Sequence, residues 1–312
     1  MDITLIKTFL QVAATGSFVA ASNRLFVTQS AVSLRVQRLE DSLGRQLFTR
    51  SKAGAVLTAS GREFEHYALS LLKLWEEARQ QVAIPAGFTH SLTIGAQYSL
   101  WPRLGFRWID DMQSRVPGLS IRAELGMPDR LTRFLIEGVV QAALLYTPQL
   151  RPGLEVEKVL NDELILLASW PDPTLDLEGR YVFVDWGPEF THSHALDLPE
   201  LPNTGLTMAL GALAADYVVN RKAAAYLPAR AARKYLESGQ LHLVPEAPRF
   251  PYPAWAVWRE DIDPKIAAMA KTSLSAVAFA ADDAQQMMLN RLAQISNAEE
   301  VEEMGGNGRR QV

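Results

Sequence analysis

The sequence contains no cysteine. This absence excludes disulfides, thiol catalysis and cysteine-based zinc sites, and it fits a cytosolic protein. Although 48% of the residues are hydrophobic, no stretch approaches the roughly 20 consecutive apolar residues of a membrane helix. The first residues lack the basic start, apolar core and small-residue cleavage site of a secretory signal. We therefore expect a cytoplasmic protein that does not associate with membranes.

Catalytic motifs are missing as well. There is no Gly-x-Ser-x-Gly elbow, no phosphate-binding P-loop, no His-Glu-x-x-His and no Gly-x-Gly-x-x-Gly after a predicted strand. The five His are scattered, and none is paired with a recognisable nucleophile. His192 and His194 resemble half of a metal site, but no Cys or carboxylate at ligand spacing completes it, so we expect them in a loop. The sequence predicts no enzyme activity, no metal and no cofactor.

Positive charge is scarce overall but concentrated at the N-terminus. The chain has a net charge of −4. Residues 1–62 contain eight Lys or Arg against three acidic residues, a net charge of +5, and the other 250 residues contain 23 against 32, a net charge of −9. A basic head on an acidic body is typical of a protein with one end that contacts phosphates, with chance clustering as the alternative.

The first 60 residues predict three short helices followed by a hairpin. The third helix, residues 29–43, begins after Thr28, a good N-cap, and ends at Gly44. Its apolar residues recur every three or four positions and are expected to face the core: Val32, Val36, Leu39 and Leu43. The pattern is typical of a winged helix-turn-helix whose third helix enters the major groove.

Polar and basic side chains on the outer side of this helix and on the hairpin are the predicted DNA contacts. They are Thr28, Gln29, Ser30, Ser33, Arg35, Arg38, Arg50 and Lys52. Gln29 and Arg35 are expected to reach base edges, Ser30 to approach phosphate, and Arg50 and Lys52 to contact the backbone from the wing. The alternative for each arginine is a solvated surface charge.

The same region resembles the LysR-type transcriptional regulators nearly throughout. The matching positions are Phe18, Ala20-Ala21, Leu25, residues 28–33, Leu39-Glu40, Leu43-Gly44, Leu47-Phe48, Arg50, Leu57-Thr58 and Gly61. Ser30 stands where that family often has Pro, and Leu34 where a polar or basic residue is common. The resemblance implies sequence-specific DNA binding. Farther along the chain, the first lobe of the effector domain described below is similar to an HdfR-like subgroup of this family.

A long helix is predicted from Thr58 to about Val82. Its apolar stripe is nearly heptad-spaced and consists of Phe64, Tyr67, Ala68, Leu71, Trp75, Ala78 and Val82. Such a stripe suits pairing with a second copy of the chain, with packing on its own domain as the alternative. In the family it resembles, this helix dimerises antiparallel. Residues 84–87, Ile-Pro-Ala-Gly, are expected to break the helix as a hinge.

From Ser91 onward, short apolar runs alternate with helical segments in two successive sets, which predicts parallel α/β sheets. Two α/β lobes in succession resemble the type 2 periplasmic-binding-protein fold of LysR-type effector domains. The fold class we expect is therefore multidomain: an α-helical winged helix-turn-helix, a long linker helix, and an α/β two-lobed periplasmic-binding-protein-like effector domain.

The expected domain boundaries come from these patterns. They are 1–58 for the DNA-binding domain, 59–88 for the linker helix and hinge, 89–282 for the effector domain, and 283–312 for a disordered tail. Within the effector domain, lobe 1 is expected at about 89–161 and 259–282, and lobe 2 at about 162–258.

Ligands of open α/β sheets bind at the carboxyl ends of strands. That rule predicts the following effector contacts: Gln97, Tyr98, Ser99, Trp101, Asp129, Tyr146, Thr147, Asp185 and Trp186. Ser99 at a helix start would suit an anion, whereas Asp129 and Asp185 argue against a highly charged anion. For Trp101 and Trp186, core packing is the alternative.

The predicted partners complete the functional hypothesis. We expect double-stranded DNA with a partly palindromic operator, an unknown small-molecule effector, a second copy of the chain in a dimer or tetramer, and RNA polymerase. The alternative function is a DNA-binding regulator with no metabolite effector. Catalysis is the least supported function class.

Overall fold

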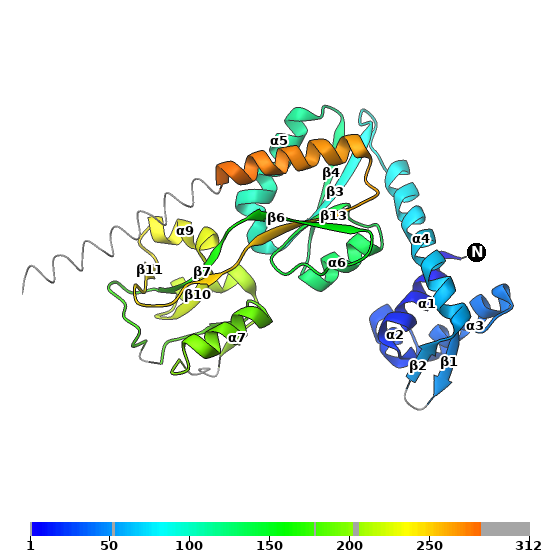
Figure 1. Ribbon diagram of the computed structural model, residues 1–312, viewed down its shortest axis with the longest axis horizontal. Coiled ribbons are helices and arrows are strands. Elements are labelled where there is room, and N and C mark those ends of the chain that lie inside the picture. Colours follow the sequence, from blue (N-terminus) through cyan, green and yellow to red (C-terminus); the bar gives the residue numbers. More distant parts are fainter. Residues whose placement is uncertain (1, 52–53, 178, 202–205, 282–312) are drawn as a thin grey trace, which may run out of the picture. The chain divides into compact units, whose positions relative to one another are not determined.

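The computed structural model describes residues 2–51, 54–177, 179–201 and 206–281 (Figure 1). These residues form two compact units. The first unit comprises the chain up to Ser91 together with Arg133–Val140, and the second comprises Leu92–Thr132 together with the described residues from Gln141 onward. The expected tail at 283–312 lies outside the described residues.

Three helices build the core of the first unit: α1 (Ile3–Thr15), α2 (Phe18–Leu25) and α3 (Gln29–Leu43). Local chemistry sets where they begin and end. The Ser17 hydroxyl accepts a hydrogen bond from the Ala20 N–H, the Thr28 hydroxyl accepts one from the Ala31 N–H, and Gly44 ends α3 with φ of 66°. The bounds of α3 agree with the helix predicted at residues 29–43.

The apolar side of α3 is narrower than predicted. Val32, Val36 and Leu39 are fully buried, but Leu43 is 40% exposed. The expectation that Leu43 faces the core was wrong because the chain turns away at Gly44 and leaves the last turn of the helix uncovered.

A hairpin and a long helix follow these three helices in the first unit. Strands β1 (Phe48–Ser51) and β2 (Gly54–Leu57) pair antiparallel, and α4 (Ala59–Val82) comes next. The Thr58 hydroxyl accepts a hydrogen bond from the Gly61 N–H at 2.9 Å, as an N-cap does. A Cβ at position 61 would lie 2.1 Å from the Leu47 carbonyl oxygen, so only glycine lets α4 lie this close to the chain before β1.

A five-stranded sheet forms the first half of the second unit, in the order β4 (Leu119–Leu125), β3 (His90–Ala96), β5 (Ala142–Leu145), β13 (Ala254–Arg259), β6 (Leu154–Leu160). Helix α5 (Phe106–Arg115) and the helix at residues 264–281 pack on this sheet. The two helices are joined by a hydrogen bond from the Trp108 indole N–H to the Ala270 carbonyl at 3.1 Å. Figure 1 shows these two helices side by side.

The second sheet is centred on β7 (Glu163–Ala168). Strands β10 (Ala224–Pro228) and β11 (His242–Leu243) flank it, and β12 (Phe250–Pro251) pairs with it farther along. All three pair with β7 antiparallel, and β13 pairs antiparallel with both β5 and β6. The two-set α/β architecture is confirmed, whereas the expectation of parallel sheets holds for the β3–β5 pair and for the small pair β8 (Phe183–Val184) and β9 (Thr207–Met208).

The chain passes between the two sheets twice, and the two passages meet at Asp162. The first leads from β6 to β7 and the second from β12 to β13. The Tyr252 N–H on the second passage donates to the Asp162 carbonyl at 2.7 Å, and the Asp162 carboxylate accepts from the Glu163 and Arg230 N–H groups at 2.9 and 3.3 Å.

One helix was missed by the sequence analysis. Residues Pro188–Asp197 form α7, which begins with Pro at its first turn, so His192 and His194 lie on a helix rather than in a loop. Among the described residues, further helices are α6 (Pro128–Ile136), α8 (Ala214–Val219) and α9 (Ala229–Glu237), with 3₁₀ turns at Tyr98–Leu100 and Gly211–Leu213 and a π-helical turn at Trp101–Gly105.

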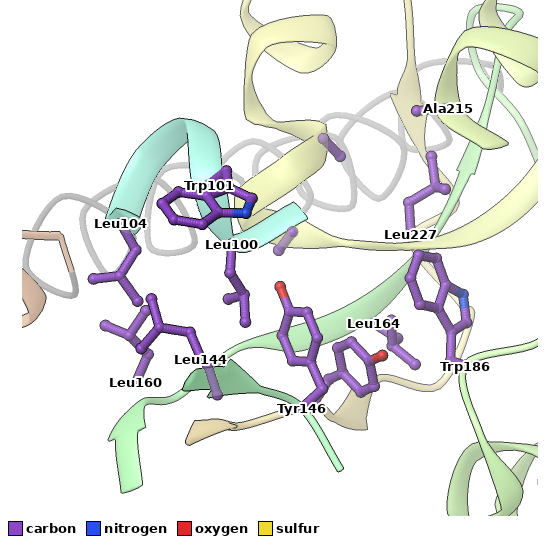
Figure 2. Packing of buried hydrophobic residues seen from close by; sticks show 14 of the residues in the cluster. Leu100, Trp101, Leu104, Leu144, Tyr146, Leu160, Leu164, Trp186, Ala215 and Leu227 are labelled. Atoms are coloured by element: carbon purple, nitrogen blue, oxygen red, sulfur yellow. The ribbon is translucent and has the colours of Figure 1, made fainter. Parts of the chain in front are cut away.

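A single apolar cluster runs through the second unit and includes residues of both sheets. Figure 2 shows Tyr146 near its centre, with Leu100, Trp101 and Leu104 on one side and Leu164, Trp186 and Leu227 on the other. Among the described residues, no helix is both long enough and apolar enough to cross a bilayer.

Candidate nucleic-acid interface and ligand cavity

The first turn of α3 presents polar side chains to solvent. Thr28, Gln29 and Ser30 are exposed and Ser33 is half-buried, while Val32 on the opposite side is fully buried. The Thr28 hydroxyl caps the helix at Ala31 and lies 3.0 Å from the Ser30 hydroxyl. The start of α3 is therefore a capped polar end that is exposed to solvent.

The predicted basic contacts differ in their surroundings. Arg38 is exposed, whereas Arg35 is half-buried and interacts electrostatically with the Asp2 carboxylate. The Arg50 guanidinium on β1 lies 4.2 Å from the centre of the Phe18 ring, so it stacks on the head's own core while remaining exposed. Lys52 lies outside the described residues.

Glu40 connects α3 to the hairpin. Its Oε1 accepts hydrogen bonds from the Leu47 N–H at 2.7 Å and the Phe48 N–H at 3.2 Å. These two N–H groups precede or begin β1, so one carboxylate sets the position of the wing relative to α3.

Helix α4 has two different long faces. Ala68, Leu72 and Glu76 are buried, and the Glu76 carboxylate lies 3.1 Å from the Lys7 ammonium and 2.8 Å from the Arg79 guanidinium. On the outer face, the exposed apolar side chains are Tyr67, Leu74, Trp75, Ala78 and Val82. Ala68 of the predicted stripe faces inward instead, and Phe64 and Leu71 pack partly against the core of the first unit.

The second unit contains a cavity of about 190 Å³ at the ends of the central strands. It is lined by Gln97, Tyr98, Ser99, Met127, Pro128, Tyr146, Thr147, Asp185, Trp186, Gly187, residues 209–212 and Tyr252. Most of these residues directly follow strands of the five-stranded sheet or of the small β8–β9 pair, and Tyr252 lies on the passage from β12 to β13.

Aromatic stacking forms the rear wall of this cavity. The Tyr146 and Tyr252 rings stack with centroids 4.1 Å apart, and the Trp186 ring meets Tyr252 edge-on at 5.5 Å. The Trp186 indole N–H donates to the Tyr226 carbonyl at 2.8 Å, and the Gln97 side-chain oxygen accepts from the Tyr146 N–H at 2.8 Å. These hydrogen bonds fix the Trp186 ring and the Tyr146 backbone, and so they hold the aromatic rings in position at the cavity wall.

Comparison with known proteins decides the family. Residues 3–62 match the family described as bacterial regulatory helix-turn-helix protein, lysR family, and residues 85–277 match the LysR substrate binding domain. The chain belongs to the LysR family of transcriptional regulators. It carries a helix-turn-helix for DNA and an effector-binding domain, as the sequence predicted.

Relatives of this LysR-family protein agree with that assignment. The HTH-type transcriptional regulator HdfR of Escherichia coli is 33% identical over 270 residues, which cover 84% of this chain and 94% of HdfR. The relatives are named as regulators, not as enzymes. The resemblance to an HdfR-like subgroup is confirmed.

Solved structures share the fold. A full-length OxyR variant from Pseudomonas aeruginosa superimposes with a TM-score of 0.54 at 21% identity, covering 88% of this chain and 98% of OxyR. ArgP from Mycobacterium tuberculosis gives a TM-score of 0.52 at 22% identity, and the match covers 89% of this chain and 97% of ArgP. The expected fold class, a helix-turn-helix joined to an α/β effector domain, is confirmed.

Within this LysR-family protein, seven of the nine predicted effector contacts line the cavity. Trp101 does not: it is 7% exposed and packs in the apolar cluster, with its ring 5.8 Å from that of Phe106. Asp129 does not line the cavity either, and its carboxylate accepts a hydrogen bond from Gln149 at 3.0 Å.

Two parts of the cavity lining, Tyr252 and the segment at residues 209–212, were not predicted from the sequence. Tyr252 lies between β12 and β13, and in the sequence it stands between two prolines, Pro251 and Pro253. Its position in the cavity depends on the second passage between the sheets, a long-range feature with no local signal. A Tyr flanked by prolines before a strong strand pattern was the one available hint.

Tyr146 and Tyr252 in the rear wall of the cavity are neutral at physiological pH. Burial raises the pKa of Tyr146 well above its usual value, an effect reinforced by the nearby Asp162 carboxylate and opposed by the Ser99 hydroxyl. Burial likewise raises the pKa of Tyr252. Both hydroxyls therefore act as hydrogen-bond donors or acceptors and carry no charge.

His194 has a structural environment. Its Nε2 lies 2.8 Å from the Tyr181 hydroxyl, and its ring packs among Phe183, Phe190 and Tyr226. Burial lowers the pKa of His194, so the imidazole is neutral. In the described part of the chain, no three His, Cys, Asp or Glu side chains are grouped as a metal site would require.

Proposed function

We propose that this regulator reads its operator with the exposed start of α3 and adjusts its DNA binding to a small molecule held in the cavity of the second unit. The observation that carries the DNA contact is the polar end formed by Thr28, Gln29 and Ser30 above a buried apolar face. Side chains at such a helix start contact base edges and phosphates in helix-turn-helix proteins.

The proposed contacts divide into two roles. Gln29, Ser33 and Arg35 read bases, whereas Thr28, Ser30, Arg38, Arg50 and Lys52 bind the sugar-phosphate backbone. Base contacts carry sequence preference, and phosphate contacts carry affinity for any duplex. Binding should weaken steeply with salt, because each neutralised phosphate releases counterions.

A gel-shift comparison tests the division of roles. Gln29→Ala should lower affinity for the operator by about 1–3 kcal/mol and leave scrambled DNA nearly unaffected, whereas Arg50→Ala should weaken both. Gln37→Ala, an exposed glutamine on the same helix, is the matched control and should change neither. Equal losses on both DNAs for Gln29→Ala and Arg50→Ala would contradict the proposal.

We propose further that two copies pair through the outer face of α4 and that the dimer binds a partly palindromic operator. Tyr67, Leu74, Trp75 and Val82 support this proposal, because four large apolar side chains on one exposed helix face suit burial against a second copy. Tetramers and contact with RNA polymerase, which a regulator of transcription needs, belong to the same proposal. The protein would then work in the cytoplasm, where chromosomal DNA lies in bacteria.

The cavity supports effector sensing through Gln97, Tyr98, Ser99, Tyr146, Thr147, Asp185 and Trp186, with Trp101 and Asp129 behind or beside it. Thermal unfolding of the full chain against a metabolite panel tests it, since a ligand at 100 times its Kd adds about 2.7 kcal/mol to stability. One observation favours the alternative, a regulator without a metabolite: the cavity of about 190 Å³ is smaller than the roughly 300–1,000 Å³ of common ligand sites. No stabilisation by any compound would support that alternative.

A further inference from the structure

The cavity of the second unit has an uneven charge. Among its described lining residues, Asp185 is the one charged side chain, and none is Lys, Arg or His. Asp185 is exposed, and its Oδ1 accepts a hydrogen bond from the Gly187 N–H at 2.9 Å. An anionic ligand would therefore meet a like charge and no cation on this wall.

Two of the helix starts at this cavity carry acidic residues of their own. The start of α6 at Pro128 lines the cavity, and α7 begins just after the lining residue Gly187. Helix N-termini attract anions, but each of these carries a carboxylate of its own. Asp129 lies in the first turn of α6, Glu189 lies in the first turn of α7, and Asp185 accepts the N–H of Gly187. At α6 and α7 the positive helix ends are therefore offset by the protein's own carboxylates.

Two cations near the cavity wall are also compensated. Arg230 interacts electrostatically with Tyr146, but it is buried 3.9 Å from the Asp162 carboxylate and donates to the Ala281 carbonyl at 3.0 Å. Lys234 interacts with Tyr98, but its ammonium lies over the Tyr235 ring at 4.3 Å and interacts with Asp216. Neither side chain lines the cavity.

Exposed apolar side chains surround the same cavity. Tyr98 is 48% exposed, Met127 is 61% exposed and Leu210 is 57% exposed, and all three are lining residues. Large apolar groups left open to water at a concave site favour a ligand with an apolar body that covers them. Aromatic rings and Met also attract organic cations and aromatic rings more than they attract carboxylates.

From these observations we infer that the effector is a small organic cation, an amine with an apolar or aromatic body. Its ammonium group lies against the Asp185 carboxylate, and its body lies against Tyr98, Met127 and Leu210. The inference rests on the proposed effector function and narrows it to one chemical class.

Matched probes that differ only in charge test the inference. The full-length protein is titrated calorimetrically at low ionic strength with benzylamine, benzamide and benzoate, and with butylamine, butyramide and butyrate. In at least one series the amine should bind about tenfold or more tightly than the acid, with the amide between them. The preference should shrink as salt is added, because Asp185 is exposed.

A substitution assigns the preference to one side chain. Asp185→Asn removes the charge but keeps an oxygen that can accept the Gly187 N–H, so it should reduce the amine-to-acid ratio to about one without unfolding the domain. Asp110→Asn, an exposed carboxylate on α5 that does not line the cavity, is the control and should keep the ratio.

The outcomes separate the two proposals. Tighter binding of the acids overturns the cationic class and leaves effector sensing standing. A ratio unchanged by Asp185→Asn also overturns the assignment to this carboxylate. If none of the six probes binds while operator binding is intact, the inference falls together with the effector site, and the regulator without a metabolite is favoured.

Discussion

Replacing Glu40 should destabilise the β1–β2 hairpin, the wing, while the rest of the first unit keeps its stability. The change to make is Glu40→Ala. It removes the shared acceptor of the Leu47 and Phe48 N–H groups, which lie 2.7 and 3.2 Å from Glu40 Oε1. Both residues are buried, so the two N–H groups would lose a charged partner where water has little access.

The magnitude can be worked out from the bonds lost. Hydrogen bonds to a charged acceptor contribute about 1.5–3 kcal/mol, and a buried N–H without a partner costs about 1–3 kcal/mol. Partial access to water at the half-buried Glu40 reduces the sum, so we expect a loss of about 2 kcal/mol. At roughly 1.4 kcal/mol for a factor of ten, that loss corresponds to about a thirtyfold change in the opening equilibrium.

Hydrogen exchange followed by mass spectrometry reports this change segment by segment. Peptides that cover β1 and β2 should exchange about thirtyfold faster in Glu40→Ala than in the parent protein, whereas peptides from the second unit should be unchanged. Gln37→Ala, exposed on the same helix, serves as the control. Unaltered exchange of the hairpin, with operator affinity intact, would refute the idea that this carboxylate holds the wing.

Three further substitutions probe other contacts. Gly61→Ala places a Cβ against the Leu47 carbonyl, which would lie 2.1 Å away, and should lower the free energy of unfolding of the first unit by about 1–3 kcal/mol in urea, whereas the neighbouring exposed change Ser60→Ala should not. Leu74→Asp on the exposed face of α4 should shift the protein towards monomers in light scattering, while His66→Asp, about 100° away from Tyr67 around the helix, should leave its mass unchanged. Burial raises the pKa of Glu137 in the folded protein above its value in the unfolded protein, so stability falls as the pH rises from the lower pKa to the higher one. Glu137→Gln should therefore stabilise the protein in thermal melts at pH 7 and lose that advantage at pH 3. An equal gain at both pH values would contradict this.

Local signals explain which parts of the fold were predictable. Thr28, Gly44 and Thr58 set helix ends through bonds to residues three or four positions away, so the head could be predicted almost residue by residue. Leu43 was misjudged because burial at a helix end depends on the direction that the chain takes after Gly44. Helix α7 was missed because its buried residues Phe190 and His194 stand among polar neighbours that give no clear apolar face.

The candidate site was predictable only in part, for the same reason. The rule that ligands bind at strand ends located Gln97, Tyr146 and Asp185, which come directly after β3, β5 and β8 in the chain. It could not choose between Trp101 and Trp186, since both come after strands and both are buried in the apolar cluster, and only tertiary packing brings Trp186 to the cavity wall. The rule also could not predict the direction in which strands pair, because β10 and β13 pair with strands 30 or more residues away in sequence.

The double crossing at Asp162 has a mechanical consequence. The two connections run side by side and are joined by the hydrogen bond from the Tyr252 N–H to the Asp162 carbonyl. Together they form a two-stranded hinge between the lobes. They resist sliding and twisting of one lobe on the other but permit bending about the line that joins them. We therefore expect any closure of one lobe on the other to be a rotation about residues 162 and 252.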